Sequence, residues 1–113
     1  MRLAVGRDHR GLDLKAAAVG LIERMGHTYH DFGCYSPDSV DYPDIALDVA
    51  RGVAGGQFDW GILVCSTGIG MCITANKVKG VRAAVCADAL AAQRCREHND
   101  CNVLCLGQDM LAG

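Results

Sequence analysis

The sequence predicts a three-layer α/β/α domain built on a five-stranded parallel sheet. Five short apolar segments alternate along the chain with four segments of helical periodicity. Such alternation is typical of strand–helix–strand units, in which neighbouring strands run parallel and helices cover both faces of the sheet. The 113 residues suffice for one domain with a real core, and no repeat, linker or low-complexity segment divides them. We therefore expect a single domain over residues 1–113.

The first half of the chain supplies two strands and two helices. Residues 2–6 (RLAVG) have the pattern of a buried strand, and residues 11–25 have that of an amphipathic helix, which Gly26 ends. The apolar face of this helix is expected to contain Leu14, Ala18, Leu21, Ile22 and Met25. A shorter, more polar strand is expected at 27–32. Pro43 suits the first turn of a second helix, which the next pair of glycines ends.

The second half of the chain continues the alternation. Its elements are expected, in the order strand, helix, strand, helix, strand, at 58–64, 69–78, 81–86, 87–98 and 101–106. Trp60 is expected to pack in the core. We expect the first and third strands to be neighbours, as in the flavodoxin-like order of Rossmann-like sheets. Seven residues follow the fifth strand, so the C-terminal helix that should cover it is expected to be missing or truncated.

The composition argues against several classes of partner. The net charge is -2 with the two signs interspersed, which excludes the basic stripe of a nucleic-acid-binding or membrane-surface protein. No apolar run has the length of a membrane span and no targeting segment precedes the first strand, so we expect a cytoplasmic protein. The seven cysteines form no Cys-x-x-Cys pair and lie mostly in apolar segments. They are expected to be reduced, without a zinc site.

Residues 61–70 (GILVCSTGIG) are the most informative stretch of the chain. An apolar strand pattern ends in Cys65 and passes through a loop of small residues into a helix. The loop residues are Ser66, Thr67, Gly68, Ile69 and Gly70. Small residues let backbone N–H groups approach a ligand, and a helix N-terminus favours a thiolate and a developing oxyanion. The pattern indicates a catalytic thiol, with a buried strand-end cysteine before a tight turn as the equal alternative.

Two loops bring reactive groups to the carboxyl edge of the predicted sheet, where ligands of open parallel sheets bind. Asp8 and His9 follow the first strand, and Cys65 and Thr67 follow the third. A carboxylate, an imidazole, a thiol and a hydroxyl beside an amide-rich turn suit proton transfer on a small polyol. The alternative for the Asp-His pair is a helix cap. Tyr42 either closes one side of this pocket or packs beside a helix start.

His98 and Asn99 are expected at the opposite, amino edge of the sheet, between the last helix and the fifth strand. A five-residue strand spans roughly 17 Å, so His98 cannot reach Cys65 of its own chain. His98 is therefore either an ordinary helix-terminal histidine, which the helix dipole favours, or a residue that serves the pocket of a second subunit.

These residues match a known family. The matching segments are GRDHRG (6–11), DYPD (41–44), GILVCSTGIGMCITANKVKGVRAA (61–84) and REHNDCNVLCLG (96–107). The chain resembles the ribose-5-phosphate isomerase B / galactose-6-phosphate isomerase family of sugar-phosphate isomerases, and its Cys65 form resembles the ribose-5-phosphate type. The segments are dispersed over nearly the whole chain and appear in the family's order.

The resemblance implies interconversion of an aldose phosphate and a ketose phosphate, by default ribose 5-phosphate and ribulose 5-phosphate. It implies a cis-enediolate intermediate and no metal or nucleotide cofactor. Cys65 would move the proton between C1 and C2, and His98 and Thr67 would assist opening of the furanose ring. The implied substrate-binding set is Asp8, His9, Tyr42, Ser66, Gly68, Ile69, Gly70 and Asn99. A homodimer or homotetramer with shared sites is also implied.

Three departures from the family pattern bear on the substrate. Ser66 stands where the family usually has glycine, and Asp109 stands where it has an arginine, so that a carboxylate would repel a phosphate. The family's C-terminal segment, with a covering helix and further arginines, lies beyond residue 113. Other readings therefore stay open: an isomerase of another sugar phosphate or of a non-phosphorylated sugar, an inactive homologue acting as a binding or assembly module, and a redox thiol protein.

Overall fold

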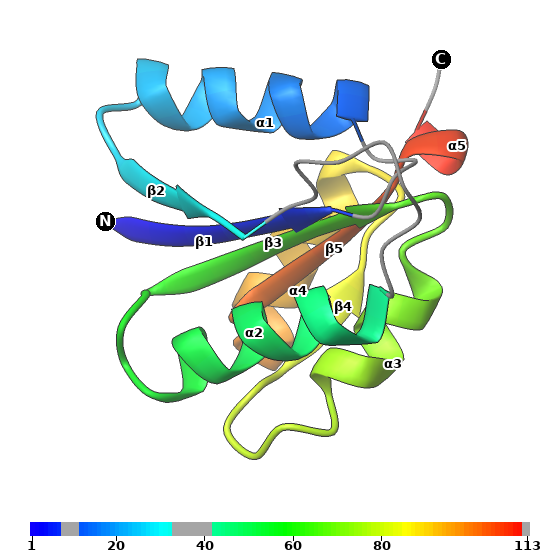
Figure 1. Cartoon of the computed structure of the whole chain (residues 1–113). Coiled ribbons are helices and arrows are strands. Elements are labelled where there is room, and N and C mark those ends of the chain that lie inside the picture. The colour runs from blue at the N-terminus through cyan, green and yellow to red at the C-terminus, as the bar shows by residue number, and fades with distance from the viewer. Residues whose placement is uncertain (8–11, 33–41, 112–113) are drawn as a thin grey trace.

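The structure of the chain is a computed structural model that describes residues 1–7, 12–32 and 42–111. Five parallel strands form one sheet, and helices lie on both of its faces (Figure 1). The elements are β1 (Arg2–Arg7), α1 (Leu12–Arg24), β2 (Thr28–Asp31), α2 (Tyr42–Ala54), β3 (Trp60–Cys65), α3 (Ile69–Ala75), β4 (Ala83–Val85), α4 (Ala89–Asn99), β5 (Val103–Gly107) and α5 (Gln108–Leu111). The predicted three-layer α/β/α class and its parallel five-stranded sheet are confirmed.

The strand order is β2–β1–β3–β5–β4. As predicted, β1 and β3 are neighbours, with Gly6 opposite Leu63. The order departs from the flavodoxin-like 2-1-3-4-5 because β5 lies between β3 and β4. Cys65, the last residue of β3, is consequently opposite Gly107, the last residue of β5. This register places the chain that follows β5 next to the loop that follows Cys65.

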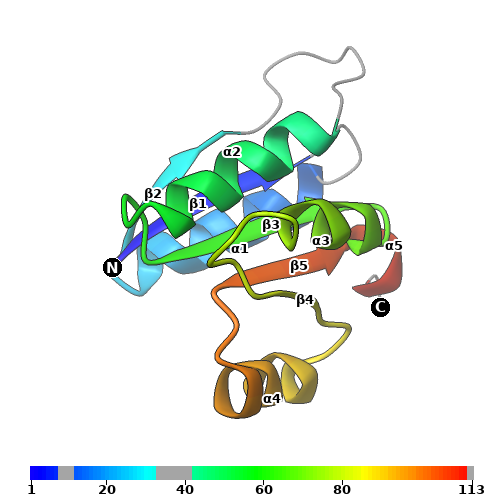
Figure 2. The ribbon, with the colours of Figure 1, turned by 90° about the horizontal axis from the view of Figure 1, so that it is seen from below.

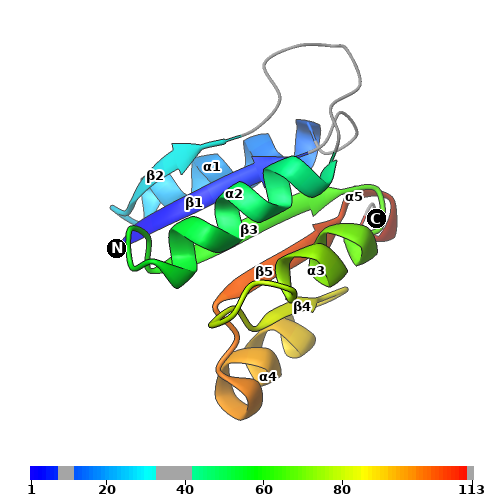
Figure 3. The same ribbon diagram turned by 60° about the horizontal axis from the view of Figure 1, so that its bottom comes forward.

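The helices α2 and α3 cover one face of the sheet, which we call the packed face (Figure 3). Two glycines of the sheet let α2 approach closely. A Cβ at Gly6 would lie 2.6 Å from Ile45 Cγ2, and a Cβ at Gly61 would lie 2.8 Å from Val49 Cγ1. The largest fully buried side chains of this face are Val49, Leu63, Met71, Val103 and Cys105. The main core of the domain therefore lies between the sheet and α2–α3.

The helices α1 and α4 lie on the opposite face, which we call the grooved face, and they are separated from each other (Figure 2). An apolar groove of about 430 Å³ lies between α1 and the sheet. Its floor consists of the outward-facing side chains of β3 and β5, which are Trp60, Ile62, Leu104 and Leu106. Trp60 is half-buried there and packs against the small buried cluster of Leu3, Val5 and Ile22, so it lies at the margin of the core and not inside it. The helix after β5, α5, has four residues.

The element boundaries differ from the predicted ones by a few residues, for local reasons. The helix expected over 69–78 ends at Ala75 because the Asn76 side chain bonds the backbone N–H and C=O of Ala83, at 2.8 and 2.9 Å. The last helix begins after Asp88, whose side chain accepts a hydrogen bond from the Ala91 N–H at 2.7 Å. None of the helices described is long and apolar enough to cross a bilayer.

Candidate active site

Cys65 lies at the carboxyl end of β3, where the sequence predicts the catalytic thiol. Its Sγ accepts a hydrogen bond from the backbone N–H of Gly68 at 2.8 Å. Gly68 has a φ of 81°, in the left-handed region that favours glycine. The Cys65 side chain is 7% exposed and joins the core of the packed face. The position is as predicted, the low exposure also fits the alternative of a buried strand-end cysteine, and the catalytic role stays a prediction.

The loop after Cys65 folds as the predicted turn into a helix. The exposed Thr67 accepts a hydrogen bond on its Oγ1 from the N–H of Ile69 at 3.2 Å, where α3 begins. The Gly68 carbonyl accepts from the N–H of Cys72 at 3.1 Å, and the Gly70 carbonyl accepts from the Thr74 hydroxyl at 3.0 Å. All five predicted loop residues therefore lie together beside the thiol.

The loop also contacts the end of β5, a contact that the sequence did not predict. The Ser66 hydroxyl donates a hydrogen bond to Asp109 Oδ2 at 2.5 Å, and the Asp109 N–H donates to the Ser66 carbonyl at 3.0 Å. A Cβ at Gly107 would lie 2.5 Å from the carbonyl carbon of Thr67, so the two backbones touch. Two departures from the family pattern, considered separately in the sequence, thus meet in one pair. Each of the two residues departs visibly from the family pattern, but only the β3–β5 register shows that they lie side by side.

Comparison with known proteins decides the family. A family model described as Ribose/Galactose Isomerase matches residues 3–113. The chain belongs to the ribose/galactose isomerase family. Its enzyme class is accordingly that of the aldose–ketose isomerases, acting on sugar phosphates, and the resemblance read from the sequence is confirmed.

Three relatives of this isomerase illustrate the match. Ribose-5-phosphate isomerase B of Escherichia coli (strain K12) is 46% identical over 106 residues, which cover 94% of this chain and 71% of that protein. D-erythrulose-4-phosphate isomerase of Pectobacterium atrosepticum is 42% identical over 109 residues, which cover 95% and 71% of the two chains. The solved structure of ribose-5-phosphate isomerase B from Clostridium thermocellum superposes with a TM-score of 0.95 at 45% identity, over 99% of this chain and 76% of that one.

The other predicted site residues of the isomerase are not brought to Cys65 within the described chain. Asp8 and His9 lie outside the described residues, and so does the side chain of Tyr42, the first residue of α2. His98 and Asn99 are exposed in the last turn of α4, which precedes the amino end of β5. Cys65 lies at the carboxyl edge, so the two alternatives for His98 stay as they were.

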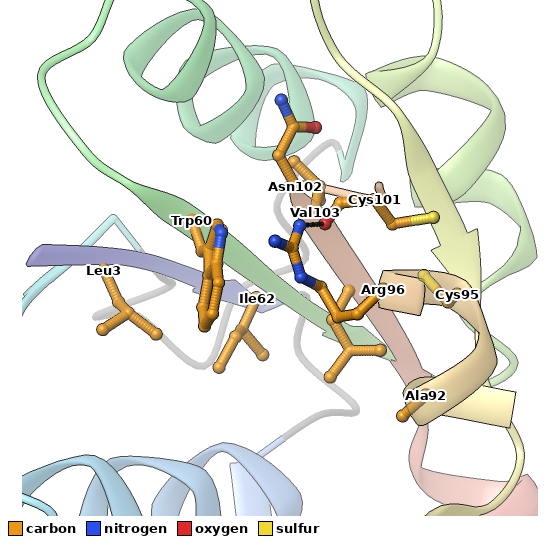
Figure 4. Close-up of a pocket in the computed structure, with 11 residues that line it drawn as sticks. Leu3, Trp60, Ile62, Ala92, Cys95, Arg96, Cys101, Asn102 and Val103 are labelled. Carbon is orange, nitrogen blue, oxygen red and sulfur yellow. Dashed lines mark hydrogen bonds between the residues drawn. The ribbon is translucent and has the colours of Figure 1, made fainter. Parts of the chain in front are cut away.

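Two apolar pockets of the isomerase lie on the grooved face and not at the Cys65 loop. The smaller, of about 150 Å³, lies between β3 and α4 (Figure 4). The Arg96 guanidinium lies over the Trp60 ring there, 4.6 Å from its centroid, and also donates a hydrogen bond to the Cys101 carbonyl. Of the predicted site residues whose side chains the structure describes, none lines either pocket. The candidate site therefore rests on the geometry of the loop and not on these cavities.

Cys72 and Cys105 form a thiol pair in the packed face, close to Cys65. A hydrogen bond from Cys105 lowers the pKa of Cys72 from 9.0 to about 7, although burial opposes the shift. The same bond, burial, and the charges of Cys72 and Cys65 raise the pKa of Cys105 well above its ordinary value. The cysteines of the described chain are free thiols, and no group of three or more His, Cys, Asp or Glu side chains there is arranged to hold a metal ion.

Proposed function

We propose that this isomerase interconverts ribose 5-phosphate and ribulose 5-phosphate, with Cys65 as the base that moves the proton between C2 and C1. The observation that carries the proposal is the thiol at the carboxyl end of β3, with the Gly68 N–H on its sulfur at 2.8 Å. A hydrogen bond donated to sulfur favours the thiolate, which is the form that accepts a proton. The E. coli and C. thermocellum relatives, both ribose-5-phosphate isomerases B, support this substrate.

The proposed chemistry is a proton transfer through an enediolate. The Cys65 thiolate takes the proton from C2 of the open-chain aldose, the C–H electron pair forms the C1=C2 bond, and the carbonyl π pair moves onto the oxygen at C1. The proton of the 2-hydroxyl passes to the oxygen at C1, which leaves the negative charge on the oxygen at C2. That oxygen then re-forms a carbonyl at C2 as the same thiol returns its proton to C1. A positioned general base contributes about 10²–10⁴-fold, and backbone donors to the developing oxyanion contribute about 10²–10³-fold. The loop from Ser66 to Gly70 is the proposed source of those donors.

A second copy of the chain completes the proposed site. His98 and Asn99 are exposed on α4, and Cys65 lies at the other edge of the same sheet. Apposition of two chains would bring the α4 terminus of one copy to the loop of the other. His98 of the second copy would then protonate the furanose ring oxygen during ring opening, with Thr67 assisting, while Asn99, Asp8, His9 and Tyr42 bind the sugar phosphate.

A specific observation favours a second candidate substrate. Asp109 places a carboxylate against the residue that follows the base, where an anionic substrate group is disfavoured. The P. atrosepticum relative is named for a tetrulose phosphate, which shows that this degree of similarity extends to proteins named for other substrates. The second candidate is therefore the isomerisation of a different aldose phosphate or of a free aldose.

A panel of substrates tests both candidates. Ribose 5-phosphate, erythrose 4-phosphate, galactose 6-phosphate and free ribose are incubated with the wild type, Cys65→Ala and Cys95→Ala. Cys95 is a buried cysteine of α4 and serves as the matched control. We expect ribose 5-phosphate to react fastest, Cys65→Ala to lose at least about 10²-fold in kcat, and Cys95→Ala to match the wild type.

The isotope content of the product tests the intermediate. In D₂O the ribulose 5-phosphate formed should carry deuterium at C1, because the thiol proton exchanges with solvent. Turnover retained in Cys65→Ala would contradict the role of Cys65. A wild type that binds sugar phosphates without converting any of them would instead support a binding or assembly module.

A further inference from the structure

The structure assigns Asp109 the role of a positioning residue that holds the Cys65 loop in its working geometry through the hydroxyl of Ser66. This inference rests on the proposed function of Cys65 as the base. Two reciprocal hydrogen bonds carry it: Ser66 Oγ donates to Asp109 Oδ2 at 2.5 Å, and the Asp109 N–H donates to the Ser66 carbonyl at 3.0 Å. The length of the first bond is typical of a hydroxyl that donates to an ionised carboxylate, which is among the stronger hydrogen bonds of proteins.

The pair closes a contact that the sheet register begins. Cys65 is opposite Gly107 at the end of the β3–β5 ladder. Immediately beyond that point the two segments of the chain could separate, because the one after β3 turns toward α3 and the one after β5 turns into α5. The Ser66–Asp109 pair connects these two segments, one residue after Cys65 and two residues after Gly107. The loop is therefore held on both sides of the turn.

Close backbone packing makes the loop sensitive to this bridge. A Cβ at Gly107 would lie 2.5 Å from the Thr67 carbonyl, and a Cβ at Gly68 would lie 3.2 Å from the Leu106 carbonyl carbon. The loop thus lies directly on the end of β5 with no space for adjustment. The Gly68 N–H that bonds the Cys65 sulfur belongs to this same loop. A loop that moves off β5 would lengthen that bond and misplace the base.

The Ser66–Asp109 pair lies near the surface, so it can hold the loop without forming part of the core. Asp109 is exposed and Ser66 is partly buried, whereas Cys65 joins the core. Removal of the bridge should therefore leave the fold intact and change the position of the loop. Misplacement of a reacting group by about 1 Å can cost about 10²-fold in rate. A merely structural surface contact would not change kcat at all.

Four variants separate position from charge. Asp109→Asn and Asp109→Ala both lose the negative charge, but only asparagine keeps an oxygen that accepts the Ser66 hydroxyl. Ser66→Ala loses the donor and keeps the charge, and Ser66→Ala/Asp109→Ala completes a double-mutant cycle. Asp48→Asn, an exposed aspartate on α2, controls for the loss of one surface charge.

Isomerase kinetics give the first readout. We expect Ser66→Ala, Asp109→Ala and the double variant to lower kcat by about the same factor of tenfold or more, with smaller changes in KM. Asp109→Asn should stay within about threefold of the wild type, as should Asp48→Asn. Additive losses in the double variant, or equal losses in Asp109→Asn and Asp109→Ala, would overturn the assignment.

Alkylation of Cys65 gives a readout that does not depend on isomerase activity. Iodoacetamide labelling of the Cys65 peptide is followed by mass spectrometry as a function of pH. The pH of half-maximal labelling should be higher in Ser66→Ala than in the wild type, and higher in Asp109→Ala than in Asp109→Asn, because the Gly68 bond to sulfur weakens. Identical profiles within each matched pair would overturn the inference. If the wild type isomerises nothing while these profiles shift as expected, the proposed function fails and the positioning role stands.

Discussion

The two faces of the sheet differ in how completely helices cover them. On the packed face, α2 lies so close to the sheet that a side chain at Gly6 or Gly61 would collide with it, and α3 covers the rest of the core. On the grooved face, α1 and α4 stand apart, and a groove of about 430 Å³ lies between α1 and the sheet. Cys65 belongs to the packed face, and the pockets belong to the other. The difference shows that the proposed base is held by the close-packed core, whereas the cavities lie on the face that the helices cover less completely.

Truncation of matched leucines should produce the largest difference between the faces. Leu63 of β3 is fully buried in the packed face, and Leu104 of the neighbouring β5 lines the groove. We expect Leu63→Ala to lower the free energy of unfolding by about 2–5 kcal/mol, because it leaves a cavity in a close-packed core. Leu104→Ala should cost about 1 kcal/mol, since its methyl groups are already partly in contact with solvent. Urea unfolding followed by Trp60 fluorescence and circular dichroism measures both values.

Equal losses for the two leucines would contradict the comparison. Such a result would mean that an apolar element covers the groove in solution, for example a second copy of the chain. Repetition over a range of protein concentrations distinguishes that case, because stability that depends on association rises with concentration.

The layers of the fold were predictable, but the place of the fifth strand was not. Alternation of strand and helix patterns is a local property, and it gave the α/β class and the five parallel strands. Strand order depends on which strand edges pair after the helices have packed. No local sequence pattern indicates whether β5 pairs with β3 or lies at the edge of the sheet. Trp60 lies at the margin of the core and not inside it for a related reason, since its burial depends on what covers the β3–β5 floor.

The part of the candidate site on β3 and its loop was predictable from the sequence, but the contact of that loop with the end of β5 was not. Cys65 and its loop follow from a strand pattern that runs into small residues, so sequence found them directly. The Ser66–Asp109 bridge depends on the β3–β5 register and could not be found. The distance of His98 from Cys65 was foreseeable, because the two residues end elements that run in opposite directions.

The cap of α4 provides a prediction of intermediate size on the grooved face. Asp88 accepts a hydrogen bond from the Ala91 N–H at 2.7 Å at the start of a helix whose buried face contains Cys95. Asp88→Ala should cost about 1 kcal/mol of stability, the usual value of a lost helix N-cap. Asp88→Asn keeps an acceptor and should cost a few tenths of that. An unchanged urea midpoint in Asp88→Ala would contradict a contribution of this cap to the stability of the folded state.

Thiol titration should show the smallest and most specific difference between the faces. Cys72, which packs against the core of the packed face, has a pKa lowered to about 7 by the hydrogen bond from Cys105. Cys101, on the grooved face, has a pKa raised to about 11, first by burial and then by its hydrogen bond with Cys95. Absorbance of the thiolate at 240 nm should therefore show a step near pH 7 that disappears in Cys72→Ala and moves toward pH 9 in Cys105→Ala.

The same shifts predict opposite effects of pH on stability. The lowered pKa of Cys72 means that the folded state binds fewer protons than the unfolded state between about pH 7 and 9. Its contribution is complete above the unfolded value of 9.0 and is lost as the pH falls through about 7. The raised pKa of Cys101 contributes stability that is complete below 9.0 and is lost as the pH rises toward about 11. Comparison of Cys72→Ala and Cys101→Ala with the wild type across pH 6–11 measures both, and a stability difference for Cys72→Ala that stays constant from pH 6 to 9 would contradict the Cys72–Cys105 bond.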